Sequence, residues 1–320
     1  MTRQPTIEWQ VGGVCNYDCS YCIQSREYRT GHPSDEQVEL FLRFFEGLPG
    51  RWEIKMTGGE PFAFRGFMQR IVPGLVERTA HMLSVLTNLS APESVLERFA
   101  RLTYGRLGIV SASLHLEFTD AVTFANKAAR LRSQLAEGAR LVVNSVLVPG
   151  RLGAVLEAEQ VLAAAGLRLF PQIMKVGSGI ATYAAEDAAA IRELVGESPS
   201  PRRANMAPSY KGRSCYAGVE YLVLLQNGDA YSCRTARRHK QGFLGNVFKG
   251  TLRRWDAPSP CPYDICPCTV PANRGMIEGV QPGDEEPAVE ARRVRLPVVT
   301  DAPVTPVAAA APIAPVGEAR

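Results

Sequence analysis

The sequence contains no apolar run of about 20 residues, the length that a membrane-spanning helix needs. Its first residues, MTRQPTIEWQ, lack the apolar stretch of a secretion signal. The formal net charge is only +4 over 320 residues, and no basic run is interleaved with aromatic residues. These absences speak against a membrane protein, a secreted protein and a nucleic-acid-binding protein in turn. We therefore expect a cytoplasmic protein.

Cysteine, by contrast, is plentiful, with eight residues. Structural disulfides are unusual in the cytoplasm, so these cysteines favour metal binding or catalysis. Cys15, Cys19 and Cys22 lie within VCNYDCSYC, and no fourth cysteine follows before Cys215. Three thiolates can hold an iron–sulfur cluster with one iron left open, because such clusters normally use four. A zinc site with a distant fourth ligand is the alternative.

Six strand candidates in the first 175 residues are rich in Val, Ile and Leu, as in strands buried on both faces. They are Ile7–Gly13, Trp52–Thr57, Met82–Thr87, Leu107–Leu114, Leu141–Val148 and Leu167–Ile173. Helical patterns lie between them, so the order predicts an α/β fold with a parallel sheet and right-handed crossovers. Periodicity alone leaves open whether the sheet curls into a partial barrel. Reactive groups are expected at the carboxyl ends of the strands.

Four of the helices between these strands carry end signals, two capping boxes and two glycine C-caps. The capping boxes are Ser34 with Gln37 and Ser90 with Glu93, and the glycines are Gly138, after a helix over Thr119–Glu137, and Gly166, after a helix over Leu152–Ala165.

The pattern changes from about residue 176. Ala185–Val195 predicts a further helix, residues 199–208 form a polar connector, and Asn227-Gly228 between two apolar stretches predicts a β-hairpin. Beyond residue 276 the chain is rich in Pro, Ala and Val, which is typical of a disordered tail. We expect a core domain over 1–198, a cysteine-rich domain over 199–276 and a tail over 277–320.

A second motif, TGGEP at residues 57–61, ends the second strand. Gly58 and Gly59 allow a close backbone approach, and the Glu60 carboxylate can accept from an ammonium group. Together with the cysteine spacing and Tyr21 before the last cysteine, it resembles the radical S-adenosylmethionine (SAM) superfamily. The resemblance implies a partial (β/α)6 TIM-like barrel. It also implies a 4Fe-4S cluster on the three cysteines, with SAM chelating the fourth iron and cleaved to a 5′-deoxyadenosyl radical that abstracts a substrate hydrogen.

Other polar residues at strand ends match this family pattern more loosely. Asn88 follows the third strand, and Ser113 on the fourth is the expected SAM contact. Asn144 and Gln172 interrupt apolar strands, so they bind either a ligand or a partner within the core. His115, Lys55 and Lys175 are candidates for proton transfer or substrate contact. Purely structural roles on the surface or in the core are the alternative.

The remaining cysteines are Cys215, Cys233, Cys261, Cys266 and Cys268. With NGDAYSC and LGN they resemble the auxiliary-cluster domains called SPASM and twitch. Five cysteines can ligate one auxiliary 4Fe-4S cluster with one to spare, and a four-cysteine zinc knuckle is the alternative. Cys266 and Cys268 form a C-x-C pair that departs from the pattern, so the ligand set stays open.

Enzymes of this kind mature ribosomal peptides or natural products, or dehydrogenate small molecules such as aminocyclitols. We expect the first class, with the small-molecule dehydrogenase and a non-catalytic iron–sulfur or SAM-binding protein as alternatives. Only 14 residues precede Cys15, so a peptide-recognition domain would come from a separate protein. A flavodoxin- or ferredoxin-type reductant is also implied.

Overall fold

The computed structural model describes residues 3–24, 29–177, 179–195, 209–264, 266 and 268–280, and the backbone of 298–299. The predicted connector at 199–208 and most of the predicted tail lie outside these residues. Within the described part of the chain, no helix combines the length and the apolar character that crossing a bilayer would require.

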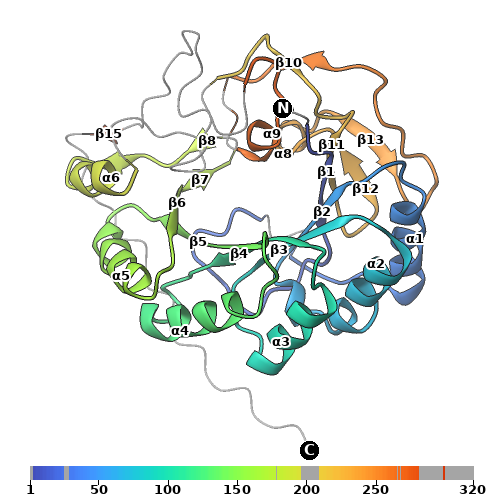
Figure 1. Ribbon diagram of the computed structural model, residues 1–320. Coiled ribbons are helices and arrows are strands. Elements are labelled where there is room, and N and C mark those ends of the chain that lie inside the picture. Colours follow the sequence, from blue (N-terminus) through green and yellow to red (C-terminus); the bar gives the residue numbers. More distant parts are fainter. Residues whose placement is uncertain are drawn as a thin grey trace, which may run out of the picture.

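One mixed α/β sheet of nine strands organises the molecule (Figure 1). Its order is β13-β12-β11-β1-β2-β3-β4-β5-β6. The strands are β1 (Thr6–Gln10), β2 (Glu53–Thr57), β3 (Met82–Thr87), β4 (Leu107–Ser113), β5 (Arg140–Leu147), β6 (Leu169–Ile173), β11 (Tyr221–Leu224), β12 (Asp229–Tyr231) and β13 (Phe243–Asn246). The first six run parallel in chain order, as predicted, and the sheet curls into a partial TIM-like barrel.

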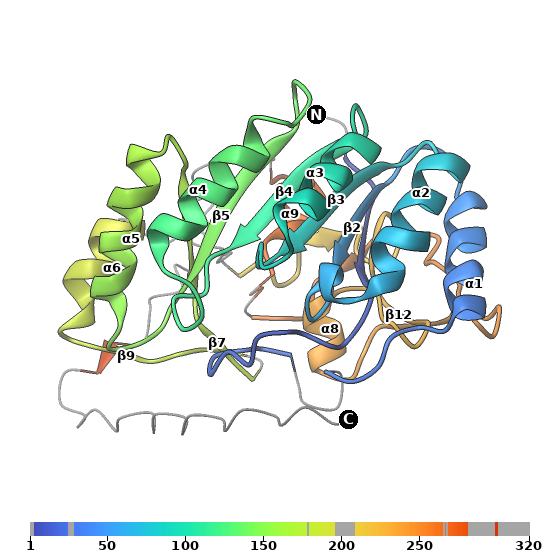
Figure 2. The same cartoon turned by 90° about the horizontal axis from the view of Figure 1, so that it is seen from below.

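Helices line the outer side of this arc, and shorter elements lie across its opening (Figures 1 and 2). The outer helices are α1 (Asp35–Glu46), α2 (Val72–Arg78), α3 (Glu93–Leu102), α4 (Ala121–Arg132), α5 (Leu152–Ala164) and α6 (Asp187–Val195). The opening is flanked by α8 (Arg234–Arg238) and α9 (Val270–Asn273). Small two-stranded sheets join β7 (Lys175–Val176) to β8 (Gly179–Ile180), β10 (Ser214–Cys215) to β14 (Ser259–Pro260), and β9 (Tyr183–Ala184) to β15 (Val298–Val299).

The helix signals had mixed outcomes. The capping box of Ser34 and Gln37 is present at α1. The one predicted at Ser90 is wrong, because α3 begins after Pro92 and the Ser90 amide donates to Asn88 Oδ1 instead (2.9 Å). Gly138 is not a C-cap either, since α4 already ends at Arg132.

Gly166 lies one residue beyond the C-cap of α5 and has a positive φ of 67°. This left-handed conformation suits glycine and is the usual way for a helix to end.

The two faces of the strands differ in polarity, although β1 is buried on both faces, as the sequence predicted. On β1, Ile7 and Trp9 are fully buried in the main hydrophobic core, and the Trp9 ring packs against Phe41 of α1. Residues of the opposite face, such as Glu8, are polar and point to the inside of the curve. The inner face can therefore offer hydrogen bonds and charge to a ligand.

The predicted hairpin around Asn227-Gly228 is confirmed, but its place in the molecule could not be foreseen. Strand β11 pairs in parallel with β1, so that Thr6 lies opposite Tyr221 and Trp9 opposite Leu224. Strands β12 and β13 then continue the sheet in antiparallel fashion. The cysteine-rich segment is thus joined to the first strand by main-chain hydrogen bonds.

Candidate functional site

The three N-terminal cysteines lie in the loop after β1. Cys15 is half-buried, Cys19 is buried and Cys22 is exposed. Burial, with smaller contributions from the charges of Cys22 and Cys15, raises the pKa of the Cys19 thiol to about 12. The three thiols are therefore close enough to interact electrostatically. Over the described residues, no group of three His, Cys, Asp or Glu side chains is arranged to hold a single metal ion.

Aromatic contacts hold this cysteine loop against the segment that follows β4. The Tyr17 ring stacks on Phe118, with ring centroids 4.5 Å apart. Tyr21 Oη lies 2.9 Å from His115 Nδ1, and Cys19 Sγ lies 3.4 Å from the same nitrogen. Burial lowers the pKa of His115 to about 4. The imidazole is consequently neutral near pH 7 and takes part in positioning the loop.

A polar contact reinforces this attachment. The Glu117 carboxylate accepts from the Ser20 amide (2.9 Å) and the Ser20 hydroxyl (2.5 Å). Arg151 Nη1 donates to the same carboxylate at 2.8 Å. Because Ser20 lies between Cys19 and Cys22, these bonds fix the backbone that carries two of the thiols.

The Gly-Gly-Glu segment after β2 runs beside the start of the cysteine loop. The Gly59 amide donates to Gly12 O and the Glu60 amide to Val14 O, both at 3.0 Å. A Cβ atom on Gly58 would lie 2.5 Å from Gly12 O, and one on Gly59 would overlap the Val14 carbonyl. The glycines are thus required for the two loops to pack, whatever else they bind.

The Glu60 side chain is buried and ties the end of β3 to this segment. It accepts from Thr87 Oγ1 (2.7 Å), the Asn88 amide (2.7 Å) and the Phe62 amide (3.1 Å). Burial raises its pKa to about 7 even though these donors oppose the shift. Asn88 Nδ2 in turn donates to Asn16 Oδ1 in the cysteine loop (3.0 Å).

Three of the predicted polar residues lie on the inner face of neighbouring strands. Ser113 of β4 is paired with Asn144 of β5, and Gln172 follows on β6. The Asn144 amide makes one long hydrogen bond, to Val142 O at 3.4 Å. The side chains of Ser113 and Gln172 make no hydrogen bond to another described residue. Their polar atoms therefore remain open toward the inside of the barrel.

A buried charge network, which we call the Glu8 network, lies deeper on the same face. Glu8 Oε2 accepts from Arg234 Nε (2.8 Å) and Tyr221 Oη (2.5 Å), and Glu8 Oε1 lies 3.4 Å from Lys55 Nζ. Cys268 Sγ is 3.7 Å from Glu8 Oε2. Burial opposes the ionisation of Glu8, but the charges of Arg234 and Lys55 hold its pKa well below the usual value.

Sequence reasoning named Lys55 and Cys268 but missed Glu8 and Arg234. The signal that could have identified Glu8 is an acidic residue between the apolar residues Ile7 and Trp9 of the strand TIEWQ. Arg234 offered no such signal, because its partner is 226 positions away. Arg234 Nη2 also donates to Thr57 Oγ1 at 3.3 Å, directly before the Gly-Gly-Glu segment. It therefore connects the C-terminal segment to both β1 and β2.

Lys175 of β7 lies beside this network. Burial, helped by the charges of Arg238 and Arg234 and opposed by those of Cys268 and Glu8, lowers the pKa of its ammonium group to about 8. Burial is therefore the main reason that its charged form is disfavoured.

The five C-terminal cysteines are gathered in one region. The pKa of the Cys266 thiol is raised well above its usual value, first by burial and then by the charges of the other four cysteines. Cys215, on β10, is buried, and Cys233 is the N-cap of α8. The predicted clustering in sequence therefore corresponds to proximity in space.

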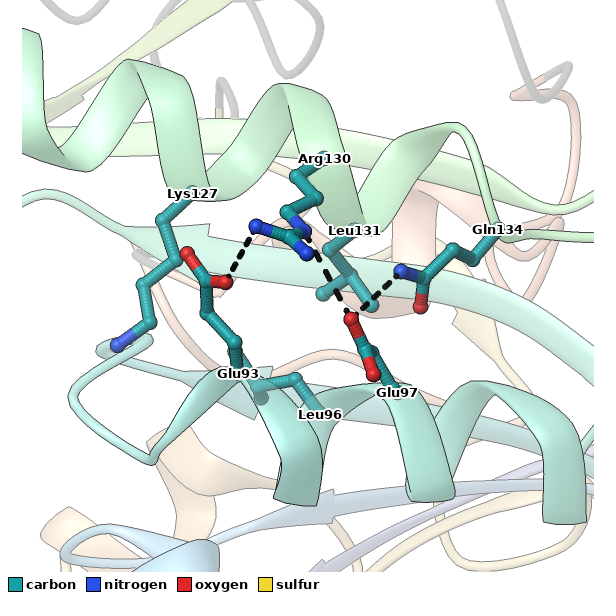
Figure 3. Close-up of a pocket in the computed structure, with 7 residues that line it drawn as sticks. All are labelled: Glu93, Leu96, Glu97, Lys127, Arg130, Leu131 and Gln134. Atoms are coloured by element: carbon teal, nitrogen blue, oxygen red, sulfur yellow. Dashed lines mark hydrogen bonds and ion pairs between the residues drawn. The ribbon is translucent and has the colours of Figure 1, made fainter.

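A shallow pocket between α3 and α4 is a separate feature (Figure 3). Arg130 of α4 forms ion pairs with Glu93 (2.7 Å) and Glu97 (3.7 Å), and Gln134 donates to Glu97 at 3.3 Å. These polar groups are paired with one another across the two helices, so the pocket presents no chemistry of its own.

Comparison with known proteins gave one family match and several structural matches. Residues 9–131 match the family model described as the radical SAM superfamily. No curated protein matches the sequence.

Solved structures that resemble the fold include Streptococcus suis SuiB bound to the precursor peptide SuiA and anSMEcpe with bound AdoMet and the Kp18Cys peptide. The SuiB match has 16% identity, a TM-score of 0.56, and covers 78% of this chain but 64% of SuiB. The anSMEcpe match has 16% identity, a TM-score of 0.53, and covers 77% of this chain and 79% of that one. At this identity the likeness concerns the fold alone.

Proposed function

Through residues 9–131 this chain belongs to the radical SAM superfamily, and from this premise we propose that it is an enzyme that modifies a peptide by hydrogen-atom abstraction. The observation that carries the proposal is the meeting of the cysteine loop and the Gly-Gly-Glu segment at the carboxyl ends of β1 and β2. When bound, a 4Fe-4S cluster and SAM supply a 5′-deoxyadenosyl radical to such a site.

The donor set fits such a cluster. Cys15, Cys19 and Cys22 are thiols on one short loop, and thiolates are the ligands that iron–sulfur clusters use. The Cys15 sulfur already accepts a hydrogen bond from the Tyr17 amide (3.4 Å), and such bonds tune the reduction potential of a cluster. Tyr21 and its partner His115 keep the loop in place.

The remaining predicted residues would bind and orient SAM. Gly58, Gly59 and Glu60 offer main-chain atoms beside the cysteine loop, and Asn88 fixes that loop from β3. Ser113, Asn144 and Gln172 present hydroxyl and amide groups from β4, β5 and β6, which are neighbours in the sheet. Polar groups of this kind fix the orientation of a ligand in an otherwise apolar site.

For the C-terminal segment we propose an auxiliary 4Fe-4S domain over 199–276, attached to a core over 1–198. Its five gathered cysteines support this assignment. A flavodoxin- or ferredoxin-type protein would reduce the clusters. The cysteines of the structure are free thiols, and free thiols persist in a reducing compartment, which supports a cytoplasmic location.

A peptide substrate is supported by the two structural relatives, both of which were solved with peptides bound. The chain spans 64% of the length of SuiB. A separate peptide-recognition protein would supply the contacts that such an enzyme needs beyond its active site.

The first test is anaerobic. The protein is reconstituted with iron and sulfide, supplied with SAM and a strong reductant, and assayed for 5′-deoxyadenosine by mass spectrometry. We expect product from the wild type and none from the triple variant Cys15→Ala, Cys19→Ala, Cys22→Ala. A Glu97→Gln variant, altered at the pocket between α3 and α4, serves as the control that retains activity.

Absence of 5′-deoxyadenosine from a wild-type protein that carries iron and sulfide would contradict the proposal and favour a non-catalytic SAM-binding protein. Substrate class is tested by adding pools of peptides or of aminocyclitols. Peptides should increase 5′-deoxyadenosine formation above the background rate. An increase with aminocyclitols alone would instead indicate a small-molecule dehydrogenase.

A further inference from the structure

The region around the Glu8 network holds more positive than negative charge. Arg234 and Lys55 both pair with the Glu8 carboxylate, at 2.8 and 3.4 Å. Two further cations, Lys175 and Arg238, lie in the same region, because each of them interacts electrostatically with Arg234. Among the described side chains of this region, four cations against one carboxylate leave an excess of three positive charges.

These cations converge from separate segments of the chain. Arg234 and Arg238 are four positions apart on α8, which places their side chains on the same side of that helix. Helix α8 flanks the opening of the barrel, and Lys175 begins β7, which follows β6 (Figure 1). The excess charge is therefore concentrated at one place and is not spread over the surface.

Lys175 and Arg238 have no carboxylate of their own. Within the described part of the chain, neither side chain forms a hydrogen bond or an ion pair with another residue, and both are half-buried. The paired cations also keep some accessible surface, since 26% of the Arg234 side chain and 18% of the Lys55 side chain are exposed, against 3% of Glu8. A ligand inside the barrel can therefore reach the cations, whereas Glu8 is largely covered.

Cations that are gathered in a partly desolvated region are costly unless an anion joins them. A guanidinium stays charged at any ordinary pH, and its planar fork of N–H donors matches the two oxygens of a carboxylate. Arg234 Nη2 donates to Thr57 Oγ1 at 3.3 Å, so the cations lie next to the Gly-Gly-Glu segment. Ser113 and Gln172 have polar atoms open toward the same interior. An anionic group bound here would lie close to the proposed site of the radical.

We propose that Lys175 and Arg238 bind a carboxylate of the peptide substrate, so that the enzyme selects a peptide with an acidic group. This inference rests on the proposed function and narrows its substrate class. The carboxylate comes either from an Asp or Glu side chain or from the C-terminus of the peptide. An iron–sulfur cluster on the C-terminal cysteines would offset part of the positive charge, so the test also follows iron content.

The probes are three pools of synthetic peptides of equal length that carry a neutral dye. The first pool contains Asp and Glu and has an amidated C-terminus. The second has Asn and Gln in their place, and the third differs from the second only in a free C-terminus. Fluorescence anisotropy measures their binding to the reconstituted protein with SAM. We expect the first or the third pool to bind about tenfold more tightly than the second, the effect of one charge-assisted hydrogen bond. The pool that does so identifies the source of the carboxylate.

Variants then locate the binding group. Lys175→Gln and Arg238→Gln should each reduce the preference severalfold, and the double variant should abolish it. Lys175→Arg keeps the charge and should keep the preference. Lys240→Gln is the matched control, because Lys240 is exposed just beyond α8 and its replacement removes the same charge from the surface. Circular dichroism melts and iron analysis show which variants fold and hold as much iron as the wild type.

Equal binding of the three pools by the wild type would overturn the proposal, as would an unchanged preference in the folded double variant. Loss of iron in a folded single variant would also overturn it, because the cations would then serve the cluster. If Arg238→Gln does not fold, the comparison of Lys175→Gln with Lys175→Arg decides.

The 5′-deoxyadenosine assay keeps the proposed function separate from this inference. Formation of 5′-deoxyadenosine without a preference for carboxylates would overturn the inference alone. A preference for carboxylates in a protein that forms no 5′-deoxyadenosine would support the anionic ligand and contradict the radical reaction.

Discussion

Lys175 carries a positive charge in surroundings that disfavour it. Its pKa in the folded protein, about 8, is lower than the value of about 10.4 in an unfolded chain. The folded state therefore binds its proton less tightly. The resulting loss of stability is fully present below pH 8 and disappears as the pH rises from about 8 to about 10.4.

We predict that Lys175→Met raises the melting temperature of the metal-free protein at pH 7 by several degrees, and that the gain shrinks by pH 10. Melts followed by circular dichroism across this range measure the effect. Lys211→Met is the control, because Lys211 is exposed and pairs with Asp264. A lower melting temperature for Lys175→Met at pH 7 would show that the ammonium group stabilises the fold.

For single residues, the sequence predicted which side chains could bind a cofactor better than it predicted which residues they contact. The spacing of Cys15, Cys19 and Cys22 predicted one loop, and the structure has one. The contact of Cys268 with Glu8 joins residues 260 positions apart. No local pattern specifies such a contact, because it depends on how β1 and the C-terminal segment are brought together in three dimensions.

Among the elements, the Gly-Gly-Glu segment depends most directly on the absence of side chains. We predict that Gly59→Ala destabilises the protein by about 1–3 kcal/mol and abolishes 5′-deoxyadenosine formation, because its Cβ would overlap the Val14 carbonyl. Urea unfolding and the deoxyadenosine assay provide the two readouts.

Gly153→Ala is the matched control. Gly153 lies inside α5, and an added Cβ would meet nothing within 4 Å. Alanine there should stabilise the helix by about 0.5–1 kcal/mol and leave the activity unchanged. Equal behaviour of the two variants would show that close packing at Gly59 is unimportant.

The hydrophobic pattern predicted the positions of the strands and helices, and each wrong prediction has a physical cause. All six predicted core strands and the helix over Ala185–Val195 are present, with ends shifted by a few residues. The second capping box failed because Asn88 Oδ1 captures the Ser90 amide. The pairing of β11 with β1 could not be predicted from the sequence, because neither segment has a local pattern that identifies its distant partner.

A buried ion pair also joins the C-terminal segment to β2. Arg274, just after α9, donates to both oxygens of Glu53 on β2, at 2.5 and 2.9 Å, and Glu53 is fully buried. Ser84 Oγ donates to the same carboxylate at 2.6 Å. Although burial opposes its ionisation, the arginine lowers the pKa of Glu53.

We predict that Arg274→Met lowers the free energy of unfolding by about 3–5 kcal/mol at pH 7, because it leaves a buried carboxylate without its cation. A Glu53→Leu, Arg274→Met double variant should recover most of the loss. Since the folded-state pKa of Glu53 is lowered, the stability it provides is present above the ordinary carboxyl pKa and is lost as the pH falls below it, where the single variant should approach the wild type. Urea titrations measure both effects, and an unrecovered double variant would contradict them.

The pairing of β1 with β11 also has a consequence for the timing of biosynthesis. Glu8 and Tyr221 are 213 positions apart, so at about 5–20 residues per second a ribosome needs roughly 10–40 s to make the second strand after the first. During that interval the nascent chain displays Cys15, Cys19 and Cys22 beside an unpaired strand edge. Cells that assemble this protein must shield that edge, and keep those thiols reduced, until the last third of the chain has emerged.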